Sequence, residues 1–302
     1  MVWNKLGLLY KPVNIHPKLK THAANPLPIH LHDDVFRIYF SGRDRTDRSS
    51  VGYVDINIIT QDIIRTCSEP LLTHGEAGSY YSHGISIGNI YTSHGKDYIL
   101  FMGWQIDKGE HWRGDVGRIQ LIDKDTMVID PEPFIGVDSV DEVSLSYPWV
   151  EANDDGSFDM WYGSTISWNS ENGEMIHVLN HATSENGEEW DRHGLSVPYE
   201  VNLAQAFSKP TVLCTPSDYK MWFSYRSGTG EKYRIGYATS ADKKNWILDL
   251  ANSGITIGPE GAWDGEMVCY PYVFQHNTET YMLYNGNGNG KTGFGLAKLE
   301  VE

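Results

Sequence analysis

The segment IYFSG (residues 38–42) is a short aromatic-rich strand that ends in a glycine, and similar segments recur along the sequence. The others are ILFMG ending at Gly103, MWYG ending at Gly163, WFSY ending at Tyr225 and LYNG ending at Gly286. The intervals between these ends are 61, 60, 62 and 61 residues, so five units account for nearly all 302 positions. A period of this length that carries only strand-like segments indicates a β-propeller with one blade per repeat.

The repeat predicts one all-β domain over residues 1–302, a five-bladed β-propeller. The expected blades cover roughly residues 13–75, 76–135, 136–198, 199–258 and 259–302, and residues 3–12 complete the last of them. The last repeat stops at its third strand, GFGLAKLEVE, while the N-terminus opens with an unpaired strand, KLGLLYKP. We therefore expect the N-terminal strand to join the last blade and close the ring, which removes exposed sheet edges. The recurring glycines are expected to lie where packing leaves no space for a side chain.

Composition excludes several classes of function. A formal net charge of −16 disfavours binding to nucleic acid and to anionic membranes. No run of 18 apolar residues is present, and the N-terminus lacks the basic and apolar regions of a leader peptide. Three cysteines without a paired spacing favour a reducing, cytoplasmic location and argue against a metal–thiolate site. The sequence does not indicate an oligomeric state.

Prolines mark the first strand of four repeats, and these strands should line the central channel. They are Pro26, Pro148, Pro210 and Pro271, and Ile87 holds the same phase in the second repeat. The residues just before these five positions are Asn25, Ser86, Tyr147, Lys209 and Tyr270. In a propeller such residues face one another, so they predict the lining of a single pocket.

Polar and aromatic residues crowd the predicted pocket, which suits a saccharide. Hydroxyl groups need fixed donors and acceptors, and the apolar face of a sugar stacks on tryptophan or tyrosine. The predicted substrate-binding residues are His22, Asn25, Arg43, Asp44, His83, Trp104, Tyr147, Lys209, Arg226, Tyr270 and Asn285. Purely structural roles are the alternatives: a salt bridge for Arg43 with Asp44, and buried, hydrogen-bonded rings for His22 and His83.

Glycosidic cleavage needs two carboxyl groups, and three candidates lie just upstream of first strands. They are Glu142 in the third repeat, and Asp264 and Glu266 in the fifth. The alternatives are an exposed loop carboxylate for each glutamate and a structural turn for Asp264.

No redox cofactor or catalytic metal is expected. The histidines of HLH (residues 30–32) share one face through the strand period alone, and the sequence has no HExxH or paired CxxC motif. A structural ion in the central channel stays open as an alternative.

Two segments that follow third strands carry a family resemblance. HATSENGEEW (181–190) and IGYATSADKKNW (235–246) resemble the A-x-S-x-D-G-x-x-W signature of the five-bladed glycoside hydrolases of families 43, 32, 62 and 130. The stretch from Trp263 to Ala297 is similar to the last blade of that superfamily. The resemblance implies the propeller fold and three inner-strand carboxylates: a first-blade aspartate as base or nucleophile, a second-blade aspartate and a third-blade glutamic acid.

The sequence departs from that pattern at the catalytic positions. Asn25 stands where the family has its first-blade aspartate, and an amide can neither accept a proton usefully nor attack an anomeric carbon. The second repeat offers Tyr81 and His83 but no carboxylate, and Glu142 lies six residues before Pro148. Three explanations are open. The chemistry has moved to Glu142, Asp264 and Glu266; or the protein is a transferase or phosphorylase, with Arg43, His83, Lys209 and Arg226 holding an anion; or it binds a glycan without catalysis.

The resemblance and the predicted pocket together favour a carbohydrate-active enzyme that cleaves or transfers a glycosidic linkage in glycan or polysaccharide metabolism. The expected partner is a saccharide or sugar-phosphate substrate. Non-catalytic glycan binding and a protein-binding scaffold are the alternatives. The sequence does not indicate which sugar, which linkage or which stereochemical outcome applies.

Overall fold

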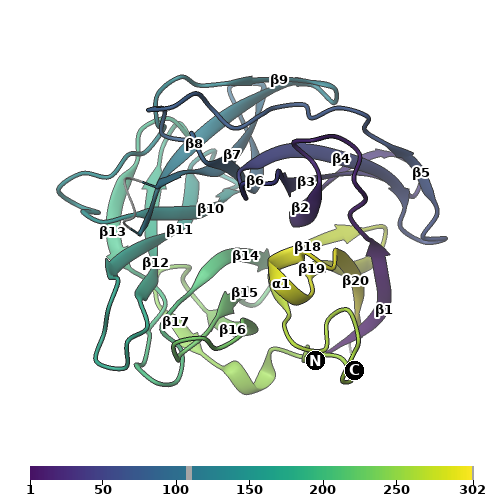
Figure 1. Ribbon diagram of the computed structural model, residues 1–302. Coiled ribbons are helices and arrows are strands. Elements are labelled where there is room, and N and C mark those ends of the chain that lie inside the picture. Colours follow the sequence, from purple (N-terminus) through teal and green to yellow (C-terminus); the bar gives the residue numbers. More distant parts are fainter. Residues whose placement is uncertain (107–110, 301–302) are drawn as a thin grey trace.

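The computed structural model describes residues 1–106 and 111–300. It is all-β, as expected: antiparallel sheets stand around a central space, and the polypeptide passes through them in order (Figure 1). The short segments η1 (Leu250–Asn252) and α1 (Asn287–Gly290) are the helices of the described residues. Residues 107–110 and 301–302, which the expected second and fifth blades include, lie outside the described residues.

Each sequence repeat supplies a set of consecutive strands whose partners are their neighbours in the sequence. The bounds are β1 Val2–Tyr10; β2 Thr21–His32, β3 Val35–Arg43, β4 Ser49–Asn57 and β5 Ile63–Thr66; β6 Gly84–Ser93, β7 Lys96–Ile106, β8 Trp112–Asp123 and β9 Thr126–Ile129; β10 Leu145–Ala152, β11 Phe158–Ser167, β12 Ile176–Ser184 and β13 Asp191–Leu195; β14 Ser208–Cys214, β15 Tyr219–Tyr225, β16 Arg234–Ser240 and β17 Trp246–Leu248; β18 Cys269–His276, β19 Glu279–Asn285 and β20 Phe294–Glu300.

The N-terminal strand completes the sheet formed by the last three strands. β1 pairs antiparallel with β20 from Val2 opposite Glu300 to Tyr10 opposite Phe294, so this sheet has the order β1-β20-β19-β18. Figure 1 shows the two strands side by side although they lie at opposite ends of the sequence. The sets β2–β5 and β6–β9 join through one parallel bridge, Ser49 to Gly84, and so count as one eight-stranded sheet.

The first strands of four repeats are bulged just before their prolines. The register of each strand shifts at this point, and the preceding residue has a positive φ: 55° at Asn25, 26° at Tyr147, 52° at Lys209 and 53° at Tyr270. A residue other than glycine adopts a positive φ only at a cost of about 1–3 kcal/mol. Such strain clusters where a fold positions functional groups, and here it recurs at the equivalent position of four repeats.

The glycines that end the second strands lie where packing excludes a side chain. A Cβ on Gly103 would lie 2.6 Å from the ring of Tyr80, and one on Gly286 would lie 2.4 Å from the ring of Trp263. A Cβ on Gly163 would lie 2.1 Å from Ser146 Oγ. The repeated glycine thus marks close approach, as the sequence predicts.

Within residues 1–106 and 111–300, no helix has the length and apolar character needed to span a membrane.

Candidate functional site

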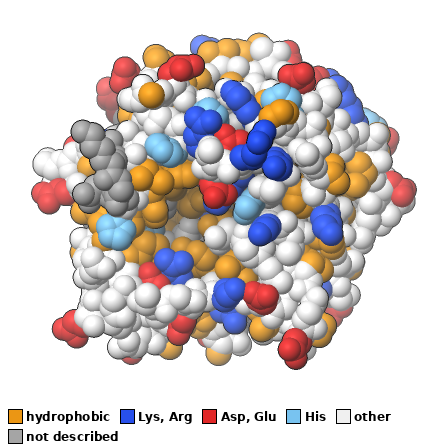
Figure 2. Space-filling model, in the orientation of Figure 1, with side chains coloured by type: hydrophobic (Ala, Val, Ile, Leu, Met, Phe, Trp, Pro, Cys, Tyr) orange, Lys and Arg blue, Asp and Glu red, His pale blue; other side chains and the backbone are white. Residues whose placement is uncertain are grey.

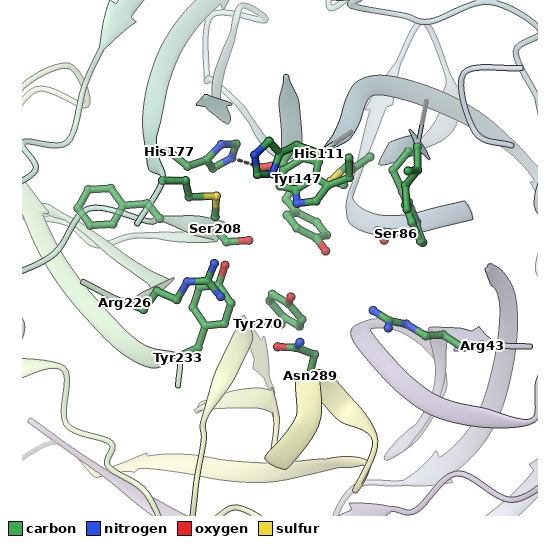
Figure 3. A pocket seen from close by; sticks show the side chains of 17 residues that line it. Arg43, Ser86, His111, Tyr147, His177, Ser208, Arg226, Tyr233, Tyr270 and Asn289 are labelled. Atoms are coloured by element: carbon green, nitrogen blue, oxygen red, sulfur yellow. Dashed lines mark hydrogen bonds between the residues drawn. The ribbon is translucent and has the colours of Figure 1, made fainter. Parts of the chain in front are cut away.

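A pocket of about 460 Å³ opens at the centre of one face of the molecule. Figure 2 shows the hollow in this face, and Figure 3 shows side chains from several sheets converging on it. Three kinds of segment meet there: the beginnings of first strands, the ends of second strands and the beginnings of third strands. The lining residues are Arg43, Ser86, Met102, Trp104, Ile106, His111, Trp112, Ser146, Tyr147, Met175, His177, Phe207, Ser208, Arg226, Tyr233, Tyr270 and Asn289.

Aromatic side chains form much of the wall. The rings of Tyr147 and Tyr270 lie 5.5 Å apart, and those of Tyr270 and Tyr233 lie 6.0 Å apart. Their hydroxyl groups point toward the middle of the pocket (Figure 3). Burial raises the pKa of Tyr233 to about 12, although the nearby Arg226 opposes the shift. These phenols therefore stay protonated at neutral pH and can donate and accept hydrogen bonds.

Two arginines enter the pocket from opposite sides (Figure 3). Arg226, which follows β15, is paired with buried Glu174 at 2.9 Å from Nε to Oε2, and its guanidinium lies 4.9 Å from the Tyr233 ring centre. Arg43 ends β3, and its ion pair within the described residues is with exposed Asp47, at 3.8 Å. Both groups can bind oxyanions or sugar hydroxyls.

A buried network of polar side chains forms part of one wall. Ser146 Oγ and His177 Nε2 share a hydrogen bond of 2.6 Å, and His177 Nδ1 shares one of 2.7 Å with Thr165 Oγ1. Burial, together with the Arg226 charge, lowers the pKa of His177 to about 3. The imidazole is therefore neutral at pH 7 and serves as a fixed hydrogen-bonding group that orients Ser146.

No aspartate or glutamate lines the pocket among the described residues. Glu142 is exposed and lines a separate hollow beside β11 and β12. Asp264 is buried and accepts hydrogen bonds from Lys5 Nζ at 2.6 Å and from the Tyr284 hydroxyl at 3.1 Å. Glu266 is exposed and pairs with Lys232 at 2.6 Å. The catalytic role of these three carboxylates stays a prediction, and their placement outside the pocket does not support it.

Of the predicted binding residues, the structure brings five to the pocket wall: Arg43, Trp104, Tyr147, Arg226 and Tyr270. Trp104 is held in place by a 3.1 Å hydrogen bond from its indole N–H to Ser49 Oγ. Their role in binding a substrate stays a prediction, but their placement agrees with it.

The other six predicted binding residues lie outside the lining: His22, Asn25, Asp44, His83, Lys209 and Asn285. Asn285 is fully buried, and it accepts a 2.8 Å hydrogen bond from the backbone N–H of Asn25. Asp44 Oδ1 accepts hydrogen bonds from Thr46, and its Oδ2 pairs with Arg48 rather than Arg43. These contacts tie strands and loops together.

The remaining three predicted residues also make contacts within the protein. Lys209 Nζ donates to the carbonyl of Gly88 at 2.6 Å, and burial lowers its pKa to about 7. His83 Nδ1 accepts the backbone N–H of Ile106 at 3.2 Å. The His22 ring hydrogen-bonds Thr21, and burial followed by the Arg43 charge lowers its pKa to about 4.

The sequence prediction missed the residues that begin third strands. His111 and Trp112 stand at the start of β8, His177 at the start of β12, and Tyr233 just before β16. Successive strands of a blade are antiparallel, so the end of a second strand and the start of a third share one face of the molecule. Reading the start of each third strand in the same way would have found these residues. Asn289 comes from α1, which no sequence signal indicated.

Nothing in the described residues suggests a metal centre. No group of three or more histidine, cysteine, aspartate or glutamate side chains within residues 1–106 and 111–300 is arranged to hold an ion.

Comparison with known proteins places this sequence in a family. No model of a known protein family matches it. Two proteins of Mycobacterium tuberculosis, Uncharacterized protein MT1551 of strain CDC 1551 / Oshkosh and Uncharacterized protein Rv1502 of strain H37Rv, are each 36% identical to it over 303 residues. The matches cover 99% of this sequence and 100% of each relative. The protein belongs to the family of these two mycobacterial proteins.

Several solved structures that are similar to this family member are glycoside hydrolases by name. One described as a glycoside hydrolase matches with a TM-score of 0.78 at 16% identity, covering 99% of this protein and 92% of that one. A thermostable family-43 glycoside hydrolase matches with a TM-score of 0.72 at 15% identity, covering 97% and 93%. The GH43_1 enzyme from Xanthomonas citri complexed with xylotriose matches with a TM-score of 0.63 at 15% identity, covering 94% and 88%. At these identities the likeness shows a shared fold.

Proposed function

We propose that this protein is a carbohydrate-active enzyme that binds a saccharide in the central pocket and transfers its glycosyl group. The observation that carries the proposal is the make-up of the pocket wall: aromatic rings, phenol and serine hydroxyls and two guanidinium groups, with no carboxylate among the described lining residues. Aromatic faces stack on the apolar face of a sugar ring, while the hydroxyls and guanidinium groups fix its orientation.

The absence of carboxylates from the described lining favours transfer over hydrolysis. A conventional glycosidase places two carboxyl groups across the scissile bond, one to protonate the leaving oxygen and one to attack or activate water. The described lining supplies neither. A leaving group that departs as a stable anion needs no proton, and preorganised guanidinium groups stabilise the charge that develops on it. Glycosyl transfer to an acceptor hydroxyl therefore suits this lining better than hydrolysis of an ordinary glycoside. In that step the bond from the anomeric carbon to the leaving oxygen breaks, the bond to the acceptor oxygen forms, and the departing anion takes up the proton of the acceptor hydroxyl.

The arrangement of the strands supports a five-bladed ring as the frame of this site. Each repeat supplies one set of consecutive paired strands, and the pairing of β1 with β20 gives the last set its outer strand. The pocket then lies at the mouth of the ring's channel, where bulged first strands aim Tyr147 and Tyr270 at its centre. The fold shared with glycoside hydrolase structures agrees with this frame.

Non-catalytic saccharide binding is the second candidate. The same absence of described carboxylates from the lining favours it, because a pocket can recognise a sugar through aromatic and hydrogen-bonding groups alone.

A combined binding and turnover assay tests the proposal. The purified protein is titrated with monosaccharides, glycosyl phosphates and sugar nucleotides, and product formation is followed with each in the presence of an acceptor sugar. Trp112→Ala and Tyr270→Phe remove a stacking surface and a hydroxyl from the wall, while Tyr225→Phe alters a half-buried tyrosine outside it.

Three outcomes are distinguishable in that assay. We expect binding and glycosyl transfer that both fall at least tenfold in Trp112→Ala or Tyr270→Phe and not in Tyr225→Phe. Saturable binding without turnover would establish the second candidate instead. No binding to any saccharide would contradict both.

A further inference from the structure

The two arginines of the pocket differ in how their charge is compensated. Arg226 Nε lies 2.9 Å from Glu174 Oε2, and its Nη2 donates to Glu174 Oε1 at 3.1 Å. Glu174 is 5% exposed, so this carboxylate is a permanent neighbour that no solvent screens. Arg226 therefore enters the pocket as one half of a neutral pair, suited to hydrogen bonding with neutral oxygens.

Arg43 lacks such a buried partner within the described residues. Its ion pair is with Asp47, at 3.8 Å, and the Asp47 side chain is 74% exposed. A pair of this length at an exposed site contributes little, because solvent screens it. The nearby carboxylate of Asp44 is engaged by Thr46 and Arg48. The guanidinium of Arg43 thus brings a largely uncompensated positive charge to one end of the pocket.

The side chains that line the pocket around Arg43 are neutral hydrogen-bonding groups, and none of the described ones is an anion that would compete with a ligand for the guanidinium. Ser86 lies on the same side of the pocket as Arg43, while the hydroxyls of Tyr147 and Tyr270 and the amide of Asn289 lie nearer its middle (Figure 3). The buried Oδ1 of Asn289 has no hydrogen-bond partner in the described residues, and as an acceptor it suits a sugar hydroxyl beside the anion rather than the anion itself. Hydroxyl donors grouped with a guanidinium whose one ion pair is long and exposed form a setting for an oxyanion.

The charge of the whole protein sharpens the contrast. With 24 basic and 40 acidic residues, the protein has a net negative charge that disfavours anions in general. An anionic ligand therefore gains only where a local positive group faces it without an acidic partner. Arg43 comes near to this condition, because its acidic partner in the described residues is the exposed Asp47 at 3.8 Å.

We infer that the saccharide carries an oxyanion group, a phosphate or a carboxylate, that binds at the Arg43 end of the pocket. This inference rests on the proposed function and narrows its substrate class to acidic sugars and sugar phosphates. The neutral sugar ring then lies toward Trp112, Tyr233 and the Arg226–Glu174 pair.

The test compares matched charged and neutral ligands by calorimetry at low and high salt. The probes are glucose, glucose 1-phosphate, glucuronic acid and inorganic phosphate, the last because its binding does not depend on sugar stereochemistry. The variants are Arg43→Gln, Arg43→Lys, which keeps the charge, and Arg45→Gln, an exposed arginine two residues away that does not line the pocket. Circular dichroism and the melting temperature establish that each variant is folded.

In the wild type we expect inorganic phosphate, glucose 1-phosphate or glucuronic acid to bind at least tenfold more tightly than glucose. Arg43→Gln should reduce that preference to less than threefold, Arg43→Lys should keep part of it, and Arg45→Gln should leave it intact. A preference for the phosphate or for the carboxylate probe identifies which oxyanion the site takes. Equal affinity for all four probes, or a preference that survives Arg43→Gln, would overturn the inference.

The same titrations, with Trp112→Ala added to the variants, separate this inference from the proposed function. If neutral and charged sugars bind equally well through the aromatic wall, the proposed function stands and the anion subsite falls. If inorganic phosphate binds through Arg43 but Trp112→Ala changes no sugar affinity, the anion subsite stands and saccharide recognition in the pocket falls.

Discussion

At the scale of single residues, Gly163 connects the sequence repeat to the chemistry of the pocket. It ends a second strand like the other recurring glycines, but its neighbours are polar: a Cβ here would lie 2.1 Å from Ser146 Oγ and 2.4 Å from His177 Nε2. The glycine leaves room for the buried hydrogen bond between these two side chains. Its absence of a side chain is thus needed for the wall of the site as well as for packing.

Gly163→Ala should therefore cost both stability and binding. The added methyl group must displace Ser146 or His177, both buried, and overpacking of this kind destabilises by about 1–3 kcal/mol. Urea unfolding and saccharide titration measure the two effects. Gly136→Ala is the control, because the nearest atom to its Cβ lies at an ordinary 3.5 Å. Wild-type stability in Gly163→Ala would show that Ser146 and His177 can move to make room for the methyl group at no cost.

Lys209 offers a prediction about pH at the same scale. Burial lowers the pKa of its ammonium group from 10.5 to about 7, so between these values the folded protein holds the lysine neutral while the unfolded polypeptide takes up a proton. Raising the pH through this window therefore favours the folded state, because the unfolded state binds more protons. Lys209→Met should remove this contribution.

We subtract the free energy of unfolding of the wild type from that of Lys209→Met. We expect this difference to be larger, and so more favourable to the variant, at pH 7 than at pH 9. Urea unfolding of both proteins at the two pH values measures it. Arg45→Gln, exposed and remote from this group, should show no such change with pH. A difference that is the same at both pH values would mean that the lysine keeps its ordinary pKa.

The sequence predicted which positions of the first strands lie near the pocket, but it did not predict which of their side chains point into it. The proline phase identified Tyr147 and Tyr270, which do line the pocket, together with Asn25 and Lys209, which do not. All four share the same left-handed backbone. The difference lies in the hydrogen bonds that each finds, such as that of Lys209 to Gly88, and no local pattern contains such long-range partners.

At the scale of elements, a charged contact helps to hold β1 against the last sheet. Lys5 in β1 donates to Asp264 at 2.6 Å, and the Tyr284 hydroxyl of β19 donates to the same carboxylate. Asp264 is thus at the junction of the N-terminal strand with the last sheet, which gives it a structural role independent of any catalysis.

Asp264→Asn should lower the free energy of unfolding by roughly 1–3 kcal/mol, because it removes the charge partner of a buried contact. Glu266→Gln is the matched control: its carboxylate is 61% exposed and pairs with an exposed lysine, so its loss should change stability by less than about 1 kcal/mol. Urea unfolding measures both, and turnover per folded molecule should stay unchanged in each. Loss of turnover in Asp264→Asn at full stability would instead revive its catalytic role.

The elements themselves followed from the repeat, since period-two alternation and turn residues recur in each unit. It was harder to predict which side chains next to these strands reach the pocket. Glu142 and Glu266 stand at plausible places in the sequence, yet neither lines the pocket: Glu142 lines a separate hollow, and Glu266 pairs with exposed Lys232. Loop direction depends on contacts such as the pair of Lys232 with Glu266, which link residues 34 positions apart.

At the scale of the whole molecule, the N-terminal strand should determine whether the fold stays intact. Removing residues 1–10 deletes β1 and exposes the backbone edge of β20. Exposed edges promote association between molecules, so the truncated protein should aggregate or unfold at a lower temperature. Size-exclusion chromatography and thermal unfolding measure this. A truncated protein that stays monomeric with an unchanged melting temperature would show that the strand is dispensable.

The central claim is that a saccharide binds in the pocket at the channel mouth, and a crystal structure of the protein with bound ligand tests it most directly. Crystals are soaked with the tightest ligand found by titration. The account predicts a sugar ring against Trp112 and Tyr270, with any phosphate or carboxylate group within hydrogen-bonding distance of Arg43. A ligand bound elsewhere on the molecule, or one in the pocket whose anionic group points away from Arg43 toward Glu174, would contradict it.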